Sequence, residues 1–370
     1  MVVSCSNKDG GSESAASVTT SPASLIAGSE KSELTLEVTA SGPWYASVPE
    51  SCGDWMSVSP TYCADSKGTV KVSVDENIKK SERTGEVNIR VAGSSDLHPV
   101  TVKQAAYDPG ETEYVCPLDG YSLVWHDEFD EGSVKTANWK FENWPWYYVN
   151  NELQYYVAGG EFDGFKTAFV EEDALHIKAQ KYTGNQKFNN TTDINGKVIS
   201  ARMNTKSSWT YGYFEAAIWL PKGKGTWPAF WMMPNDQSDG WPTCGEIDIM
   251  EEVGVDANQT SSSIHTQAYN HTKNTQKTKS QYTSGAESGY HIYALEWTKD
   301  YLQFYTDGKK TLRFDNDGKG DKSTWPFSKA FYMTLNLAWG GDWGGYNGVD
   351  ESALPCTMKV DYVRVYQKDR

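Results

Sequence analysis

The sequence lacks several features that would place it in common protein classes. No run of about 18 apolar residues is present, so no transmembrane helix is predicted. No CxxC pair and no HExxH motif occurs, which gives a zinc site little support. Long helical periodicity is hard to find, whereas 32 glycines, 22 tyrosines and 15 tryptophans suit an all-β protein with many turns and an aromatic-lined binding surface.

Positive charge is also scarce. Lys and Arg number 34 against 49 Asp and Glu in 370 residues, which leaves a formal net charge of −15. Nucleic acids and acidic polysaccharides would be repelled by such a chain. A neutral glycan is compatible with this charge, and the length allows two domains, or one large domain with a small one.

A complete signal peptide is missing, yet the first residues resemble the processed end of a bacterial lipoprotein. A small residue precedes Cys5, and a polar Gly/Ser-rich stretch follows it. We therefore expect residues 1–17 to form a disordered tail with an acylated Cys5 as lipid anchor. The protein would then be exported, to the outer membrane or cell surface of a Gram-negative bacterium. The alternative is a disordered tail with an incidental cysteine.

Disulfide bonding is left open by the sequence. Cys52 and Cys63 are close enough to bridge a loop, and Cys116 and Cys356 lie near the two ends of the larger domain. An exported protein permits both bridges. Free buried thiols are the equal alternative.

The strand patterns divide the chain into two domains. Residues 18–106 show short alternating strands separated by turn signals, which predicts a small immunoglobulin-like β-sandwich. Residues 107–115 are a plausible linker. Residues 116–370 are strand-rich again, which predicts two large antiparallel sheets packed face to face.

One segment of the larger domain, Gly245–Glu252, concentrates acidic residues. Its acids alternate with apolar residues, which predicts a β-strand with one apolar and one acidic face; the first three are Glu246, Asp248 and Glu251. Like charges on one face repel and raise each other's pKa, so few purely structural strands carry them. A pair of glycoside-cleaving carboxylates would explain the arrangement, and a solvated edge strand is the alternative.

The spacing of these acids implies an irregular strand. With strict alternation, Glu251 would point away from Glu246 and Asp248. A β-bulge near Ile249 and Met250 would return Glu251 to the acidic face. Strand rise would separate the outer pair by roughly 13 Å at the backbone. Side chains leaning inward could then reach about 5–5.5 Å, the separation found in retaining glycosidases.

Two resemblances to known families follow from longer motifs. Residues 18–106 resemble the BACON domain through Trp44 and Trp55, followed by Arg83-Thr-Gly and Val102-Lys-Gln. This resemblance implies glycan binding or a rigid spacer; we favour the spacer, with both tryptophans in the core.

The larger domain resembles glycoside hydrolase family 16, the laminarinase and lichenase group. The matching stretches run in the family's order: Trp125–Phe129, Asn150–Tyr156, Ser200–Arg202, Tyr211–Glu215, Gly225–Trp231, Gly245–Glu251, His265–Asn270, Leu335–Gly341 and Val360–Tyr366. The resemblance implies a β-jelly-roll sandwich and a retaining endo-β-glucanase. The form of the acidic motif that includes Met250 is the bulged one of laminarinases, whereas lichenases lack the extra residue.

The resemblance also implies roles for single residues. Glu246 would be the nucleophile, Glu251 the general acid and then base, and Asp248 the residue that holds these glutamates in different protonation states. Trp227 and Trp231 would stack on glucose rings in the negative subsites. Further expected sugar contacts are Asn151, Arg202, His265, Gln267, Trp339, Trp343, Trp144 and Trp146. His265 could instead orient Glu251. For Trp144 and Trp146, packing within the loop is an equally good explanation.

No cofactor is expected for catalysis. Many family members hold a structural calcium away from the chemistry, and Glu128 and Asp361 match its acidic ligand positions. The expected partner is a neutral β-glucan, either β-1,3-glucan or mixed-linkage β-1,3/1,4-glucan, bound by a monomer; membrane contact would come only through Cys5. Alternatives are an agarase, a carrageenase, a transglycosylase or a non-catalytic glycan-binding surface protein.

Overall fold

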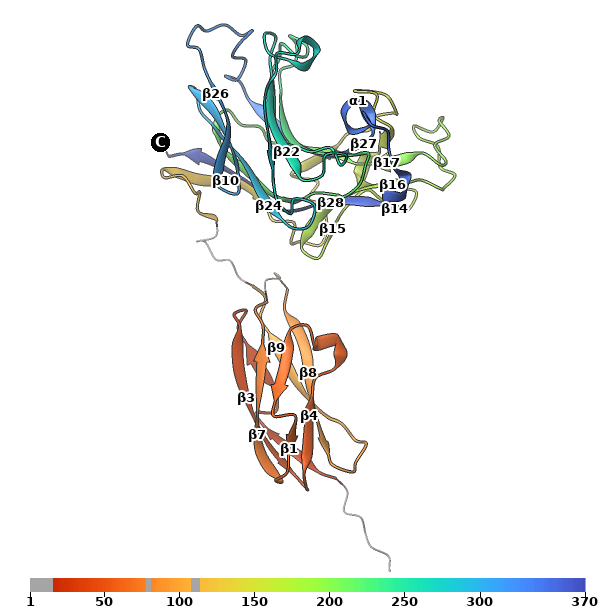
Figure 1. Ribbon diagram of the computed structural model, residues 1–370, viewed down its shortest axis with the longest axis vertical. Helices are drawn as coiled ribbons and strands as arrows, with labels where there is room; N and C mark the ends of the chain where they lie inside the picture. Colours follow the sequence, from red (N-terminus) through yellow and green to blue (C-terminus); the bar gives the residue numbers. More distant parts are fainter. Residues whose placement is uncertain (1–15, 78–80, 108–113, 370) are drawn as a thin grey trace, which may run out of the picture. The chain divides into compact units, whose positions relative to one another are not determined.

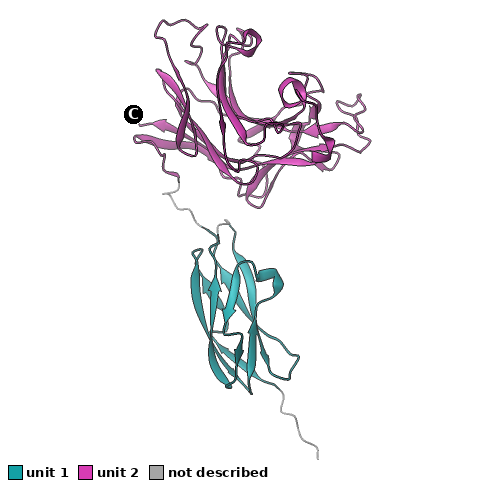
Figure 2. Cartoon of the chain, viewed as in Figure 1, with its two compact units in different colours: residues 1–110 teal, residues 111–370 magenta. Residues whose placement is uncertain are grey.

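The computed structural model describes residues 16–77, 81–107 and 114–369. Contacts divide the chain into two compact units, Met1–Gly110 and Glu111–Arg370 (Figure 2). The expected acylation site, Cys5, lies outside the described residues, as does most of the expected linker. Across the described residues, no helix has the length and apolar character needed to cross a membrane.

The N-terminal unit is a β-sandwich of two sheets. The four-stranded sheet has the order β1 (Val18–Ser21), β3 (Ser32–Ala40), β7 (Lys67–Val74), β5 (Met56–Ser59). The five-stranded sheet has the order β2 (Leu25–Ala27), β9 (His98–Gln104), β8 (Arg83–Val91), β4 (Trp44–Ser47), β6 (Tyr62–Cys63). Burial alternates along β3, β7 and β8, which is the pattern of strands with one face on a core. Trp44 is buried in this core and Trp55 packs against it, as expected.

The C-terminal unit is built on two large sheets that lie face to face (Figure 1). The ten-stranded sheet contains β12 (Gln154–Tyr156), β17 (Val198–Ser200), β16 (Ala174–Lys181), β28 (Cys356–Lys368), β19 (Gly212–Trp219), β24 (His291–Trp297), β25 (Tyr301–Thr306) and β26 (Lys309–Asp315), with β10 (Tyr121–Asp127) on β28 and β15 (Ala168–Glu171) on β16. The seven-stranded sheet has the order β11 (Trp139–Phe141), β18 (Arg202–Thr205), β27 (Phe331–Trp339), β20 (Thr226–Pro234), β21 (Glu246–Glu251), β22 (Gln259–His265), β23 (Lys277–Tyr282).

Apolar side chains from both sheets form one large core between them. Phe214 and Val363 come from the ten-stranded sheet, and Phe230, Ile247 and Leu335 from the seven-stranded sheet. Burying this apolar surface is the main force that holds the sheets together. The other face of the seven-stranded sheet is therefore free to carry polar and aromatic side chains.

Short elements complete the unit. They are the hairpin β13 (Glu161–Phe162) and β14 (Phe165–Lys166), the helix α1 (Gly341–Gly344) and the 3₁₀ turns η3 (Ala158–Gly160), η4 (His271–Lys273) and η5 (Glu351–Ala353); the N-terminal unit has η1 (Glu50–Cys52). The all-β fold predicted from the sequence is confirmed.

The cysteines resolve the open question on disulfides. The five described cysteines, Cys52, Cys63, Cys116, Cys244 and Cys356, are all free thiols. Neither of the two bridges considered from the sequence is formed. Cys116 packs in a small cluster with Tyr213 and Tyr366, whereas Cys356 belongs to the main core.

Candidate active site

Strand β21 contains the bulge that the sequence predicts. On its β20 side, Phe230 pairs with Met250 but Trp231 pairs with Asp248, so Ile249 has no partner in the register. On its β22 side the register also shifts between Asp248 and Glu251. Ile249 and Met250 are consecutive and both buried in the core. Because two consecutive side chains face the core, the alternation shifts by one residue, and Glu251 lies on the same face as Glu246 and Asp248.

Each outer glutamate is held by one tryptophan. The indole Nε1 of Trp241 donates to Oε2 of Glu246 over 3.0 Å. The indole Nε1 of Trp227 donates to Oε1 of Glu251, also over 3.0 Å. Each tryptophan thus uses one oxygen of its carboxyl group. These bonds restrict side-chain rotation, so they fix the directions from which the two glutamates face a substrate.

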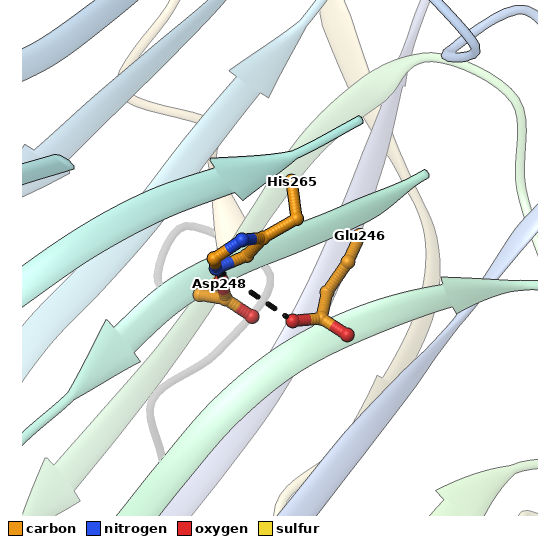
Figure 3. A group of neighbouring side chains, drawn as sticks. All are labelled: Glu246, Asp248 and His265. Atoms are coloured by element: carbon orange, nitrogen blue, oxygen red, sulfur yellow. Dashed lines mark ion pairs between the residues drawn. The ribbon is translucent and has the colours of Figure 1, made fainter. Parts of the chain in front are cut away.

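His265 stands beside Glu246 and Asp248 because Glu246 and His265 are cross-strand partners on β21 and β22. Its Nε2 lies 3.4 Å from Oδ2 of Asp248 and 3.9 Å from Oε1 of Glu246 (Figure 3). This position differs from the expected role of orienting Glu251, because the carboxylates nearest to His265 are those of Asp248 and Glu246. Sugar contact by His265 stays a prediction.

Burial dominates the electrostatics of the acidic face. It raises the pKa of Glu246, Asp248 and Glu251 above the usual carboxyl range. The charge of Asp248 raises the pKa of both glutamates further, whereas the indole hydrogen bonds oppose the rise. Neighbouring carboxyls of this kind share protons, so near neutral pH the trio does not carry three full charges. One carboxyl can therefore act as an acid while another is ionised.

Arg202 is the centre of an aromatic arrangement next to the acids. Its guanidinium carbon lies 4.0 Å from the ring centroid of Trp144 and 4.5 Å from that of Trp231. Trp231 also donates from Nε1 to Asn336, over 2.7 Å, and Asn336 in turn donates to the hydroxyl of Tyr156. Cation–π contact on both sides fixes Arg202 and the two indole planes. Trp231 is only half-buried, so part of its ring is accessible.

One of the expected sugar contacts is wrong. Trp339 is 1% exposed and belongs to the core, so its ring cannot form a wall for the substrate. It is the last residue of β27, not part of the glycine-rich loop that follows, and the register of β27 turns it inward. Trp343, in α1, is half-buried and packs edge-on against Trp227 at 5.6 Å.

The other expected sugar contacts occupy different settings. Trp146 packs against the small cluster of Tyr155 and Val157, with Lys197 over its ring, which is the loop-packing alternative. Asn151 is exposed and donates to Asp342 over 2.8 Å. Gln267 is exposed in the turn after β22. Sugar binding by these residues stays a prediction.

The two residues expected to hold calcium are differently engaged. The Glu128 carboxylate is buried and accepts two hydrogen bonds from the Arg364 guanidinium, at 2.9 and 2.8 Å. A carboxylate already paired in this way with a fixed cation suits a buried ion pair better than a calcium ligand. Asp361 lies on β28 and is half-buried. Calcium binding at this position stays a prediction.

Two further residues next to the acidic face are not found by the sequence analysis. Trp241 lies in the loop before β21, where no periodicity singles it out; only its place five residues before Glu246 hinted at a contact. Glu152 is buried beside Asn151, accepts a hydrogen bond from Gln154 over 2.7 Å, and its charge adds to the rise in the pKa of Glu251. Glu152 directly follows Asn151 in the stretch Asn150–Tyr156, and no sequence pattern distinguishes it from an exposed acid.

A two-sheet β-sandwich with paired glutamates flanking an aspartate on one strand, bordered by tryptophans, defines a glycoside hydrolase. Comparisons with known proteins narrow this class. Residues 165–364 match the model of "Glycosyl hydrolases family 16", and residues 44–105 match BACON, described as "Putative binding domain, N-terminal". The chain belongs to glycoside hydrolase family 16.

Individual relatives agree with this assignment. The chain is 40% identical over 259 residues to a beta-glucanase of Rhodothermus marinus, which covers 67% of this chain and 85% of the relative. Among solved structures, the non-specific endo-beta-1,3(4)-glucanase SCLam is 43% identical, with a TM-score of 0.61, covering 69% of this chain and 94% of that one. The laminarinase from Rhodothermus marinus is 38% identical, with a TM-score of 0.62, covering 68% and 98%.

Proposed function

We propose that this protein is a retaining endo-β-glucanase that cuts internal bonds of β-1,3-glucan, mixed-linkage β-1,3/1,4-glucan or both. The observation that carries the proposal is the bulge in β21, which brings Glu246, Asp248 and Glu251 to one face next to Trp227 and Trp231. Aromatic faces stack on the apolar faces of sugar rings, and these two rings are partly accessible. The named relatives that act on β-1,3- and β-1,3(4)-glucans support the substrate class.

The reaction would proceed by two displacements. Glu246, ionised and held at Oε2 by Trp241, attacks the anomeric carbon through its other oxygen, while Glu251 gives its proton to the leaving glycosidic oxygen. The bond to the leaving sugar breaks, and a glycosyl–Glu246 ester forms. Glu251, now ionised, takes a proton from water, whose oxygen attacks the same carbon and releases Glu246.

Asp248 has a separate task in this scheme. It lies between the two glutamates on the strand and is almost fully buried. Its charge disfavours a second charge nearby, and a hydrogen bond links it to Glu246. As Glu246 loses its charge on forming the ester, a proton on Asp248 becomes easier to release, so the total charge of the face changes little.

Reducing-sugar release from laminarin and from barley β-glucan tests the proposal, with wild type and Glu246→Gln side by side. Wild type should release sugar from at least one polymer, and the variant should fall to background. Background release by wild type on both polymers would refute the hydrolase assignment. Product analysis on each polymer then gives the linkage preference and shows whether transglycosylation products form.

A non-catalytic glycan-binding protein is the main alternative from another class. A binding surface has no need of three closely spaced, mutually repelling acids, two of them oriented by indole donors. The complete set therefore favours the enzyme.

For the N-terminal unit we propose a spacer role, in a protein anchored to the cell surface through Cys5. The supporting observation is that Trp44 and Trp55, the aromatic residues that suggested sugar platforms, are used in the core. Retention of residues 18–106 on insoluble β-glucan would contradict the spacer role. A radioactive fatty acid should label wild type but not Cys5→Ala. Labelling that persists in this variant would contradict a lipid anchor at Cys5.

A further inference from the structure

Three side chains of the acidic face bring ligand-type atoms to one point. Glu246 and Asp248 come from β21 and His265 from β22 (Figure 3). One nitrogen or oxygen atom from each lies within 4.8 Å of the others. Within the described part of the chain, no other group of three His, Cys, Asp or Glu side chains comes this close together.

The distances from His265 to the two acids suit a shared ion better than direct hydrogen bonds. Nε2 of His265 is 3.4 Å from Oδ2 of Asp248 and 3.9 Å from Oε1 of Glu246. A hydrogen bond between such atoms is normally about 2.7–3.2 Å long. Two ligands of a tetrahedral zinc ion, each about 2.0–2.1 Å from the metal, lie about 3.4 Å apart. The distance from His265 to Asp248 already equals this ligand–ligand separation. A small rotation of the Glu246 side chain would shorten the distance from His265 to Glu246 to the same value.

Burial supplies an independent reason for a cation here. Asp248 is 3% exposed and His265 is 7% exposed. Oδ2 of Asp248, the oxygen nearest the imidazole, has no hydrogen-bond partner. An oxygen left unpaired at this depth is unfavourable, because it has lost its water without gaining a donor. A metal ion between Asp248 and His265 would satisfy it.

The donor set selects the class of ion. Calcium and magnesium prefer oxygen ligands only, so an imidazole nitrogen argues against them. One imidazole with two carboxylates suits zinc and similar borderline divalent ions. Three protein ligands would leave the fourth position of a tetrahedral ion for water.

We propose that Glu246, Asp248 and His265 form a binding site for a zinc-class divalent cation, and that the bound ion reversibly inhibits the enzyme. The ion takes the Glu246 oxygen that would attack the anomeric carbon, so metal binding and glycosyl-enzyme formation exclude each other. The inhibition rests on the proposed function, whereas the binding of the ion does not.

Direct binding measurements test the site on the full chain after removal of metal with a chelator. Zinc titrated into wild type in a calorimeter should bind with a stoichiometry of one, and His265→Asn should bind at least tenfold more weakly. His291→Asn is the matched control, because it removes another imidazole–carboxylate pair of the same unit, with Nδ1 of His291 2.7 Å from Asp307. This control should bind zinc as wild type does.

A second readout keeps the proposal testable if His265→Asn folds poorly. Cobalt in place of zinc should give visible absorption of a four-coordinate site in wild type, lost in Glu246→Gln. Laminarin hydrolysis by wild type should fall with added zinc and recover with chelator. Equal zinc affinity in wild type and both binding variants, or no binding to active wild type, would overturn the site. Failure of metal-free wild type to cut any β-glucan would instead refute the proposed function and leave the binding result to stand.

Discussion

Glu252, the residue directly after β21, offers the sharpest test of the electrostatics because its side chain is 0% exposed. Its Oε1 accepts a hydrogen bond from the backbone N–H of Asn258 over 2.6 Å, whereas Oε2 has no partner. Burial, then the charge of Glu287, raises the pKa of Glu252 from 4.5 to about 8. The side chain is therefore neutral in the folded protein over most of the physiological range, and ionised in the unfolded chain.

The sign of the effect on stability follows from this difference. A raised folded pKa means that the contribution of Glu252 is fully present below about pH 4.5 and is lost as the pH rises to about 8. Each pH unit in that window is worth up to about 1.4 kcal/mol, so the full loss is at most about 5 kcal/mol. We expect about 2–3 kcal/mol after relaxation of the site. For a unit of this size that corresponds to about 5–10 °C in Tm.

The assay compares thermal unfolding of wild type and Glu252→Gln at pH 5 and pH 9, following the transition of the C-terminal unit. Glutamine has the shape of the neutral acid and cannot ionise. The variant should be no more stable than wild type at pH 5 but should gain on it by several degrees at pH 9. Glu161→Gln, at an exposed position of β13, is the control and should show no such change. A Tm difference between Glu252→Gln and wild type that is the same at both pH values would refute the reasoning.

Three further predictions concern the tryptophans. Trp241→Phe removes the hydrogen-bond donor to Glu246. Because a hydrogen bond to a charged group is worth about 1.5–3 kcal/mol, kcat on laminarin should fall by about 10- to 100-fold while Tm stays unchanged. An unchanged kcat would contradict the positioning role of Trp241. Trp339→Ala should destabilise the C-terminal unit by about 3–5 kcal/mol in denaturant unfolding, since the ring lies in the core, whereas Trp343→Ala should cost less than half as much. Trp227→Phe, which loses the bond to Glu251 but keeps a ring, should lower kcat more than it raises KM, and the reverse order would assign Trp227 to sugar binding alone.

The fold and the catalytic strand were predictable because their signals are local. Alternation of burial marks strands, and the spacing of Glu246, Asp248 and Glu251 required an extra residue, which the register shift at Ile249 supplies. Trp339 was misplaced because its environment depends on the register of β27 against β20, and a tryptophan next to glycines looks the same in either register.

Contacts between segments that are distant in the sequence could not be predicted either, because they also depend on how the strands pair. The sandwich of Arg202 between Trp144 and Trp231 joins three separate strands or loops, and none of their sequences specifies the pairing. The Glu128–Arg364 ion pair joins the residue that follows β10 to β28, so a motif position alone suggested a metal ligand where the folded chain supplies a guanidinium.

The bulge in β21 links the interior of the protein to its chemistry. Ile249 and Met250 enter the core side by side, and the positions of the acids on the opposite face depend on how those two side chains fit among their neighbours. A change in core volume at either residue would therefore alter the angle between the two glutamates without touching a sugar. Substitutions in the core beneath the sheet, as well as on its exposed face, should therefore change kcat. They should also change the ratio of hydrolysis to transfer onto a second sugar.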